Sequence, residues 1–178
     1  MDDPDRGAPD FDALFEAHHQ RVYRAAFRVT GSHADAEDVL QSVFVRLVQA
    51  YRASGRVPWN ANAGAYLGRS AINAALDLLR KRDREVAETA ASEPETAPEA
   101  ALVDRQSEEI AVRLRAALAH INPRAADMFV LRYFEEYENQ MIAEMLGTSV
   151  STVNVTLHRA LRSLQGLLTE FEGVIHER

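Results

Sequence analysis

The sequence predicts an all-α protein made of two small helical domains that are joined by a flexible acidic linker. Apolar residues recur at intervals of three and four along most of the chain, which is the spacing of one helix face. No run of alternating β-branched residues is long enough to predict a strand. Of the 178 residues, 47% are hydrophobic and 26% are charged, a composition typical of folded globular proteins.

The N-terminal domain is predicted at residues 11–85 and contains three helices. The first extends from about residue 10 to 29 and ends at Gly31, whose freedom to adopt positive φ suits the position after a helix. The second follows the capping residue Ser32 and continues to about residue 51. The third extends from about residue 62 to 84. Three helices with short connections can close one small core.

Charge is distributed unevenly around this domain. Residues 11–84 carry a net charge of +4, whereas residues 85–110 carry −7, which equals the net charge of the whole chain. Residues 86–104 are rich in Ala, Glu and Thr and contain only one pair of large apolar side chains, too few to offset the entropy lost on ordering. We therefore expect a flexible linker at 86–104. A disordered tail is expected at 1–10 and a C-terminal tail at 169–178, where the sequence favours a frayed helix end over a docking patch.

The C-terminal domain is predicted at residues 105–168, where the sequence pattern indicates four helices. Their expected ranges are about 105–120, 123–135, 138–146 and 150–168. The third of these is short, and a turn separates it from the long last helix. A short helix, a turn and a longer helix form the helix-turn-helix plan of many DNA-binding domains.

The residues around this turn meet the physical requirements of a helix-turn-helix. Ala143 is small where two helices cross, Gly147 can adopt positive φ in the turn, and Ser149 can cap the second helix. Val153 and Leu157 are expected to pack against the first helix. An ordinary helical hairpin is the alternative, but the complete pattern favours DNA binding. The side chains expected at exposed positions are Ser151, Thr152, Asn154, Val155, His158, Arg159 and Arg162.

Several other kinds of chemistry are not indicated. The chain has no Cys, its six His residues form no metal-binding spacing, and it contains no phosphate-binding loop or nucleophile motif. We expect no catalysis, no cofactor and no metal ion. No apolar run approaches the ~20 residues that span a bilayer, and no signal peptide is evident, so we expect no membrane insertion and a cytoplasmic location.

Three segments together resemble a bacterial RNA polymerase sigma factor of the sigma-70 family, in its extracytoplasmic-function group. They are DAEDVLQSVFVRLVQAY (35–51), AYLGRSAINAALDLLRKRDR (65–84) and LRAALAHINPRAADMFVLRYFEE (114–136), followed by the helix-turn-helix. Members of this group contain regions 2 and 4 of the larger sigma factors, in this order. The resemblance implies that residues 11–85 are region 2 and residues 105–168 are region 4.

The resemblance implies that the second helix binds the clamp helices of the polymerase β′ subunit. Acidic and amide groups around an exposed aromatic ring suit a helical partner rich in Arg. The alternative role of the acids is to complement the dipole of their own helix, worth about 0.3–1 kcal/mol each. The expected polymerase-binding residues are Asp35, Glu37, Asp38, Gln41, Phe44 and Val45.

The third helix and the loop before it resemble the part of the family that opens and reads the −10 promoter element. An amide can hydrogen-bond a base edge, cations neutralise phosphates, and aromatic rings stack on unpaired bases. For Trp59 and Tyr66 a place in the core is an equally good interpretation, and the cationic run could instead complement the helix dipole. The expected residues are Trp59, Tyr66, Arg69, Asn73, Asp77, Arg80, Lys81, Arg82 and Arg84.

The last helix resembles the one that reads the −35 element in the family. Asn154 and Thr156 stand where Lys or Arg is usual, and Glu136 replaces the glycine of the family's EGLS segment. Fewer cations predict weaker nonspecific binding and a shallower salt dependence. The expected residues are Ser149, Ser151, Thr152, Asn154, Val155, Thr156, His158, Arg159 and Arg162.

The implied partners are core RNA polymerase, through its β′ clamp helices and its β flap, promoter DNA, and an anti-sigma factor. A different function remains open at this point. The chain could be a stand-alone helix-turn-helix regulator or adaptor whose N-terminal bundle binds a partner. The net charge of the N-terminal domain favours the sigma factor, since a dimerisation bundle does not need the cationic run, whereas the weakly basic last helix favours the regulator.

Overall fold

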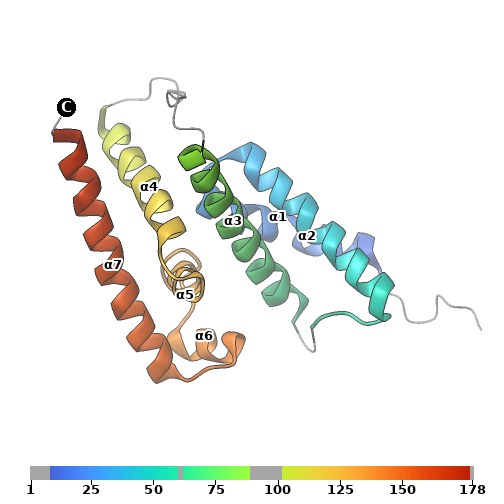
Figure 1. Ribbon diagram of the computed structural model, residues 1–178. Coiled ribbons are helices and arrows are strands. Elements are labelled where there is room, and N and C mark those ends of the chain that lie inside the picture. Colours follow the sequence, from blue (N-terminus) through green and yellow to red (C-terminus); the bar gives the residue numbers. More distant parts are fainter. Residues whose placement is uncertain (1–8, 60–61, 89–101, 177–178) are drawn as a thin grey trace, which may run out of the picture. The chain divides into compact units, whose positions relative to one another are not determined.

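The computed structural model describes residues 9–59, 62–88 and 102–176, and within these ranges it contains seven helices and no strand (Figure 1). The all-α prediction is therefore confirmed for this part of the chain. The chain divides into two compact units, Met1–Ala75 and Leu76–Arg178, and the division falls inside α3. The helices are α1 (Phe11–Thr30), α2 (His33–Ser54), α3 (Ala63–Glu88), α4 (Leu102–His120), α5 (Pro123–Tyr133), α6 (Asn139–Leu146) and α7 (Val150–His176).

Several helices are longer than the sequence predicts. The linker was expected at 86–104, but α3 continues to Glu88 and α4 already begins at Leu102, and residues 89–101 lie outside the described residues. α7 continues to His176 and so includes most of the tail expected at 169–178. The physical reason is that none of these extensions contains a proline, so nothing removes a helical hydrogen bond. The tail expected at 1–10 lies outside the described residues except for its last two positions.

In the first unit, α1 and α2 pack against each other through apolar side chains. The turn between them forms as predicted: Gly31 has φ 70°, and its N–H donates to Phe27 O at 2.7 Å. Ser32 then caps α2, because its Oγ accepts a hydrogen bond from the Asp35 N–H at 3.3 Å. The buried apolar residues of the two helices include Val22, Ala26, Val29, Val39, Val43 and Leu47.

The beginning of α3 lies close to α1. A Cβ atom at Gly64 would lie 3.2 Å from His18 Cε1, and one at Gly68 would lie 3.4 Å from Arg21 Nε. Glycine at these two positions therefore allows the backbone of α3 to approach the side chains of α1. Leu67 and Ile72 are buried on the same helix, so this part of α3 completes the core of the first unit.

In the second unit, α4, α5 and α6 all pack against α7 (Figure 1). Asn122 caps α5 through its side-chain oxygen, and Pro123 opens that helix, as the sequence predicts. Gly147 has φ 59° after α6, and Ser149 Oγ accepts a hydrogen bond from the Thr152 N–H at 3.1 Å. The predicted helix-turn-helix is therefore α6 and α7. Its buried side chains include Ile142, Ala143, Val153, Leu157, Ala160 and Leu164.

The connection between α5 and α6 contains a residue in a strained conformation. Glu136 is exposed and has φ 60°, a region that costs a residue with a Cβ atom about 1–2 kcal/mol. The neighbouring hydrogen bond from the Tyr137 N–H to Leu131 O holds the chain in this turn. We expect Glu136→Gly to raise the free energy of unfolding by about 0.5–1 kcal/mol, after the larger entropy of unfolded glycine is subtracted.

Urea unfolding of the full chain measures this change. The control is Glu144→Gly, in the regular helical backbone of α6, which should lower the free energy of unfolding by about 1 kcal/mol. If both substitutions lower stability by similar amounts, strain at Glu136 is not the explanation.

Candidate protein-binding and nucleic-acid-binding surfaces

The outer face of α2 carries most of the side chains that the sequence assigns to polymerase binding. Glu37, Gln41 and Val45 follow each other at intervals of four and are all exposed, so they form one stripe along the helix. Asp38 is exposed beside this stripe. Val45 is 54% exposed, which is a high value for a branched apolar side chain. An acidic and amide surface with an apolar group at one end is suited to bind another protein.

Asp35 does not belong to this surface. Its exposed fraction is 2%, because it lies in the first turn of α2 on the side that faces the core. Its backbone N–H donates to the Ser32 cap, and its position in the first turn is the one where an acid complements the helix dipole. The structure thus places Asp35 beneath this surface, and the exposed acids of α2 at this surface are Glu37 and Asp38.

Aromatic side chains from α1 extend this surface. Phe44 of α2 is half-buried, and its ring meets that of Phe15 edge-to-face with a centroid distance of 5.0 Å. Phe15 also stacks on His19, again at 5.0 Å, and remains 38% exposed. Phe15 and His19 were not identified from sequence as members of a binding surface. The interval of four between Phe15 and His19 is a signal that they share a face, but it does not reveal that this face is open.

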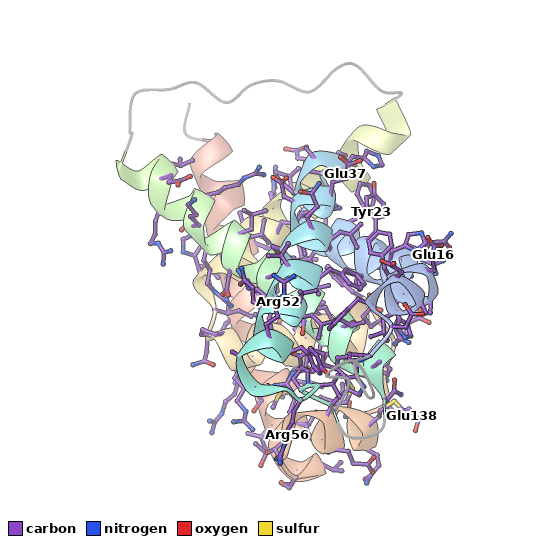
Figure 2. The ribbon with its side chains drawn as sticks, turned by 90° about the vertical axis from the view of Figure 1, so that its right-hand side faces the viewer. Glu16, Tyr23, Glu37, Arg52, Arg56 and Glu138 are labelled. Atoms are coloured by element: carbon purple, nitrogen blue, oxygen red, sulfur yellow. The ribbon has the colours of Figure 1, made fainter. Side chains whose placement is uncertain are left out.

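A shallow hollow of about 340 Å³ lies beside this surface, between α1 and α2. Tyr23 and Arg24 of α1 and Glu37 and Leu40 of α2 are among its lining residues. Figure 2 labels Tyr23 and Glu37. Its residues are contributed by both helices, so the hollow exists only once the two have packed. Tyr23 and Arg24 were not identified from sequence as members of a binding surface.

The candidate −10 residues form a long stripe on α3. Tyr66, Arg69, Asn73, Asp77, Arg80 and Arg84 are separated by three or four positions and so share one side of the helix. Tyr66 contacts Trp59 of the preceding loop with a centroid distance of 5.6 Å, and both rings are half-buried. The sequence left open whether these rings belong to the core or stack on bases. Each ring packs against the other and is still partly accessible, so the structure is compatible with both roles.

The cations at the end of this stripe differ in exposure. The Arg80 side chain is only 17% exposed, and its Nη1 lies 3.1 Å from Asp77 Oδ1, so this guanidinium is engaged within its own helix. Lys81 is exposed, with its Nζ 3.7 Å from Glu85 Oε1, a distance typical of a weak surface ion pair. Arg82 and Arg84 are exposed as well. Of the predicted cationic run, Arg80 is thus the member least able to reach a phosphate group.

The outer face of α7 presents nearly all of the side chains that the sequence assigns to the −35 element. Ser151, Val155, His158 and Arg162 form one exposed stripe at helical spacing. Thr152, Asn154 and Arg159 are exposed beside it, whereas Thr156 is half-buried. Ser149 is exposed, but its hydroxyl is used to cap α7. Asn154 Oδ1 accepts a hydrogen bond from Asn139 Nδ2 of α6, a contact that sequence reasoning did not anticipate.

Beside this face is a groove of about 680 Å³ between α7 and the junction of α4 with α5. Arg124, Arg159 and Arg162 line it together with His120, so the groove gathers three guanidinium groups from two helices. Arg124 Nη2 donates to Leu146 O at 3.3 Å, which ties α5 to the end of α6. Arg124 and His120 were missed in the sequence, since their proximity to Arg159 depends on how α4 and α5 pack against α7.

Two further observations limit the chemistry of these surfaces. Among the described residues, no group of three or more His, Asp or Glu side chains has an arrangement that could hold a metal ion. No helix in the same part of the chain has the length and apolarity needed to cross a membrane.

Comparisons with known families match both halves of the chain. The family model for sigma-70 region 2 matches residues 14–85, and the model for sigma-70, region 4 matches residues 107–164. The RNA polymerase sigma-E factor of Streptomyces avermitilis is 32% identical, over 88% of this chain and 83% of its own length. CarQ, an RNA polymerase sigma factor of Myxococcus xanthus, is 31% identical, over 93% of this chain and 94% of its own length.

Other relatives are longer than this chain. The extracytoplasmic-function sigma factor SigG of Mycobacterium tuberculosis is 29% identical, and the chain spans 48% of its length. The corresponding share for SigE of Mycolicibacterium smegmatis is 63%, at 30% identity.

Solved structures agree with the fold. The sigma factor RpoE, solved with the anti-sigma factor NepR from Bartonella quintana, has a TM-score of 0.51 at 22% identity and covers 91% of this chain and 98% of its own. CnrH, solved with the cytosolic domain of CnrY, has a TM-score of 0.55 at 23% identity. It covers 94% of this chain and 93% of its own. At these identities the likeness establishes the arrangement of helices and nothing finer.

Proposed function

The chain belongs to the extracytoplasmic-function group of the sigma-70 family, and we propose that it binds bacterial core RNA polymerase and directs it to particular promoters. In this proposal residues 11–85 act as region 2 and residues 105–168 as region 4. The chain itself carries out no catalysis, since RNA synthesis belongs to the polymerase, and it acts where the polymerase does, in the cytoplasm.

The observation that carries this proposal is the exposed face of α2. Glu37, Asp38 and Gln41 offer oxygen acceptors next to the apolar Val45, and Phe15 with Phe44 adds an aromatic surface on one side. Helices rich in Arg, such as the clamp helices of the β′ subunit, can donate to these acceptors while their aliphatic stems cover the apolar groups. We propose that this face grips the clamp, with Phe15 and His19 added to the residues expected from sequence.

The stripe on α3 supports a role in reading the −10 element. The half-buried Trp59 and Tyr66 provide accessible ring surface at one end, and Lys81, Arg82 and Arg84 provide positive charge at the other. Unpaired bases bind by stacking on aromatic rings, and their phosphates bind cations. In the proposal, Arg69 and Asn73 lie between these ends and contact the melted strand, whereas Arg80 and Asp77 support the helix.

The outer face of α7 supports a role in binding the −35 duplex. Its first turns are uncharged and its later turns carry His158, Arg159 and Arg162. A recognition helix in the major groove can use uncharged side chains of its first turns to contact base edges. It can use the basic side chains of its later turns to contact phosphates. The groove shared by Arg124, Arg159 and Arg162 adds positive charge next to the helix. The same domain would contact the β flap, which would hold a weakly binding α7 near its duplex.

An anti-sigma factor is a further proposed partner. RpoE and CnrH were solved with NepR and with the cytosolic domain of CnrY, respectively, and both share the fold of this chain. A regulator that covered the outer face of α2 would prevent polymerase binding directly. The aromatic pair and the hollow between α1 and α2 give such a regulator an apolar place to bind.

The test is reconstitution of the full chain with bacterial core RNA polymerase. We expect the chain to co-elute with core polymerase in gel filtration and to support transcription from a subset of promoters in a genomic library. A stand-alone helix-turn-helix regulator would retard promoter fragments without the polymerase. The proposal fails when the chain neither co-elutes with core polymerase nor supports initiation from any fragment.

A further inference from the structure

Of the 20 Lys and Arg residues of the chain, Lys81 is the only lysine. It lies on α3, in the cationic run at residues 80–84 that we propose as part of the −10 surface. An arginine at this position would bind a phosphate group at least as well, because a guanidinium can donate two parallel hydrogen bonds to one anion. Phosphate binding alone therefore does not account for the lysine.

The amine of Lys81 is accessible to reagents. The side chain is 65% exposed, and its Nζ lies 3.7 Å from Oε1 of Glu85, whose side chain is 58% exposed. An ion pair between two exposed side chains contributes little free energy, so this pair opens readily. A primary amine also has a chemistry that a guanidinium lacks under mild conditions: it accepts acyl groups, and acylation removes its positive charge.

Few other cations at this end of α3 could replace the charge of Lys81. Arg80 is engaged with Asp77 Oδ1 at 3.1 Å, and its side chain is only 17% exposed. Lys81 is therefore one of three exposed cations in the run, together with Arg82 and Arg84. Loss of one phosphate contact to a single strand lowers the slope of log affinity against log salt concentration by about 0.7, which corresponds to about fourfold weaker binding at about 0.15 M salt.

We propose that Lys81 is a site of acylation by an activated acyl group, an acyl phosphate or an acyl thioester, and that this modification weakens binding of the −10 strand but not of core polymerase. The inference rests on the proposed function, because it concerns the regulation of the −10 surface. In the reaction, the Lys81 ammonium first loses a proton to water. The amine then attacks the acyl carbon and forms an N–C bond, the bond from that carbon to the phosphate oxygen or thiol sulfur breaks, and the second proton leaves with the departing phosphate or thiol.

The first experiment measures the reactivity of the amine. The full chain is incubated with acetyl phosphate in one arm and with acetyl-coenzyme A in the other, and mass spectrometry of its peptides follows acetylation. Arg56→Lys introduces a comparison lysine at an exposed position of the loop before α3. We expect Lys81 to react with at least one donor as readily as this lysine, and the arm that reacts identifies the class of donor. If neither donor modifies Lys81 under conditions that acetylate the introduced lysine, Lys81 is not a modification site.

The second experiment measures the consequence for binding. Acetylated chain is assembled with core polymerase, and the holoenzyme is bound to promoter DNA whose −10 region is single-stranded. We expect about fourfold weaker binding at about 0.15 M salt and a salt slope that is smaller by about 0.7. Lys81→Gln, which removes the charge without a reagent, should show the same loss before treatment. Lys81→Arg retains the charge and is the control: treatment with the acyl donor should leave its binding unchanged.

The outcomes distinguish this inference from the proposed function. A chain that forms no holoenzyme overturns the proposed function. Holoenzyme that binds −10 DNA equally well before and after acetylation of Lys81 overturns the regulatory role of this charge. An equal loss in treated Lys81→Arg would assign the effect to another amine of the chain, and weaker binding of core polymerase by the acetylated chain would place Lys81 outside the −10 surface.

Discussion

Asp38→Arg is expected to abolish binding to core polymerase while leaving the helix content of the chain unchanged. Asp38 is exposed on the outer face of α2, and a cation there would meet the Arg-rich clamp helices that we propose as its partner. Like charges placed opposite each other at an interface cost several kcal/mol, so we expect at least about a hundredfold weaker binding. Asp38 lies beyond the first turn of α2, where the helix dipole has little effect on its charge.

Fluorescence anisotropy with labelled chain measures the affinity for core polymerase, and circular dichroism measures helix content. The matched control is Glu16→Arg, which makes the same change of charge at an exposed position of α1 in the same unit (Figure 2). We expect it to change the affinity less than about threefold. Equal losses in both variants would mean that the net charge of the first unit, and not the face of α2, governs binding.

Local interactions account for the parts of the fold that could be predicted from sequence. The ends of α1, α5 and α6 are set by Gly31, Asn122 with Pro123, and Gly147, and each acts on backbone groups within four residues of itself. Because such caps depend on the chain nearby, they can be predicted without knowledge of the tertiary structure. Helix extensions such as residues 169–176 were missed because the sequence contains no equally strong signal for their ends.

The candidate site was predicted less completely, because its composition depends on packing between helices. Asp35 and Glu37 are two positions apart with similar chemistry, yet one is 2% exposed and the other lies on the surface. The hydrogen bond from Asn139 to Asn154 joins residues 15 positions apart. Residues such as these are brought together, or hidden, by contacts that no local pattern in the sequence describes.

The strain at Glu136 and the uncharged first turns of α7 are both departures from the pattern that the resemblance implies. Glu136 stands where the family has a glycine, and the structure places it at φ 60°, the conformation that a glycine adopts without strain. Asn154 stands where the family has a cation, and the structure places it against Asn139. The first departure costs stability in the connection before α6, whereas the second removes a charge from α7.

Arg159→Ala is expected to weaken promoter binding about fivefold to tenfold at physiological salt and to leave the affinity for core polymerase unchanged. Arg159 is exposed on α7 and lines the groove that Arg124 and Arg162 also line. If it contacts a phosphate, its loss should reduce the slope of log affinity against log salt concentration by about 1, equally for all promoter sequences. Because the first turns of α7 carry no cation, we expect few phosphate contacts from this helix, so that the loss of one is measurable in the slope.

Holoenzyme binding to promoter duplexes at several salt concentrations measures both quantities. Arg52→Ala removes an exposed cation from the end of α2 and is the control, for which we expect neither the slope nor the promoter affinity to change. A contact with a base edge in place of a phosphate would appear as a loss that depends on the promoter sequence. If Arg159→Ala and Asp38→Arg impair core binding and promoter binding in the same proportion, the assignment of polymerase binding to α2 and of −35 recognition to α7 is wrong, since the two faces would then act as one surface.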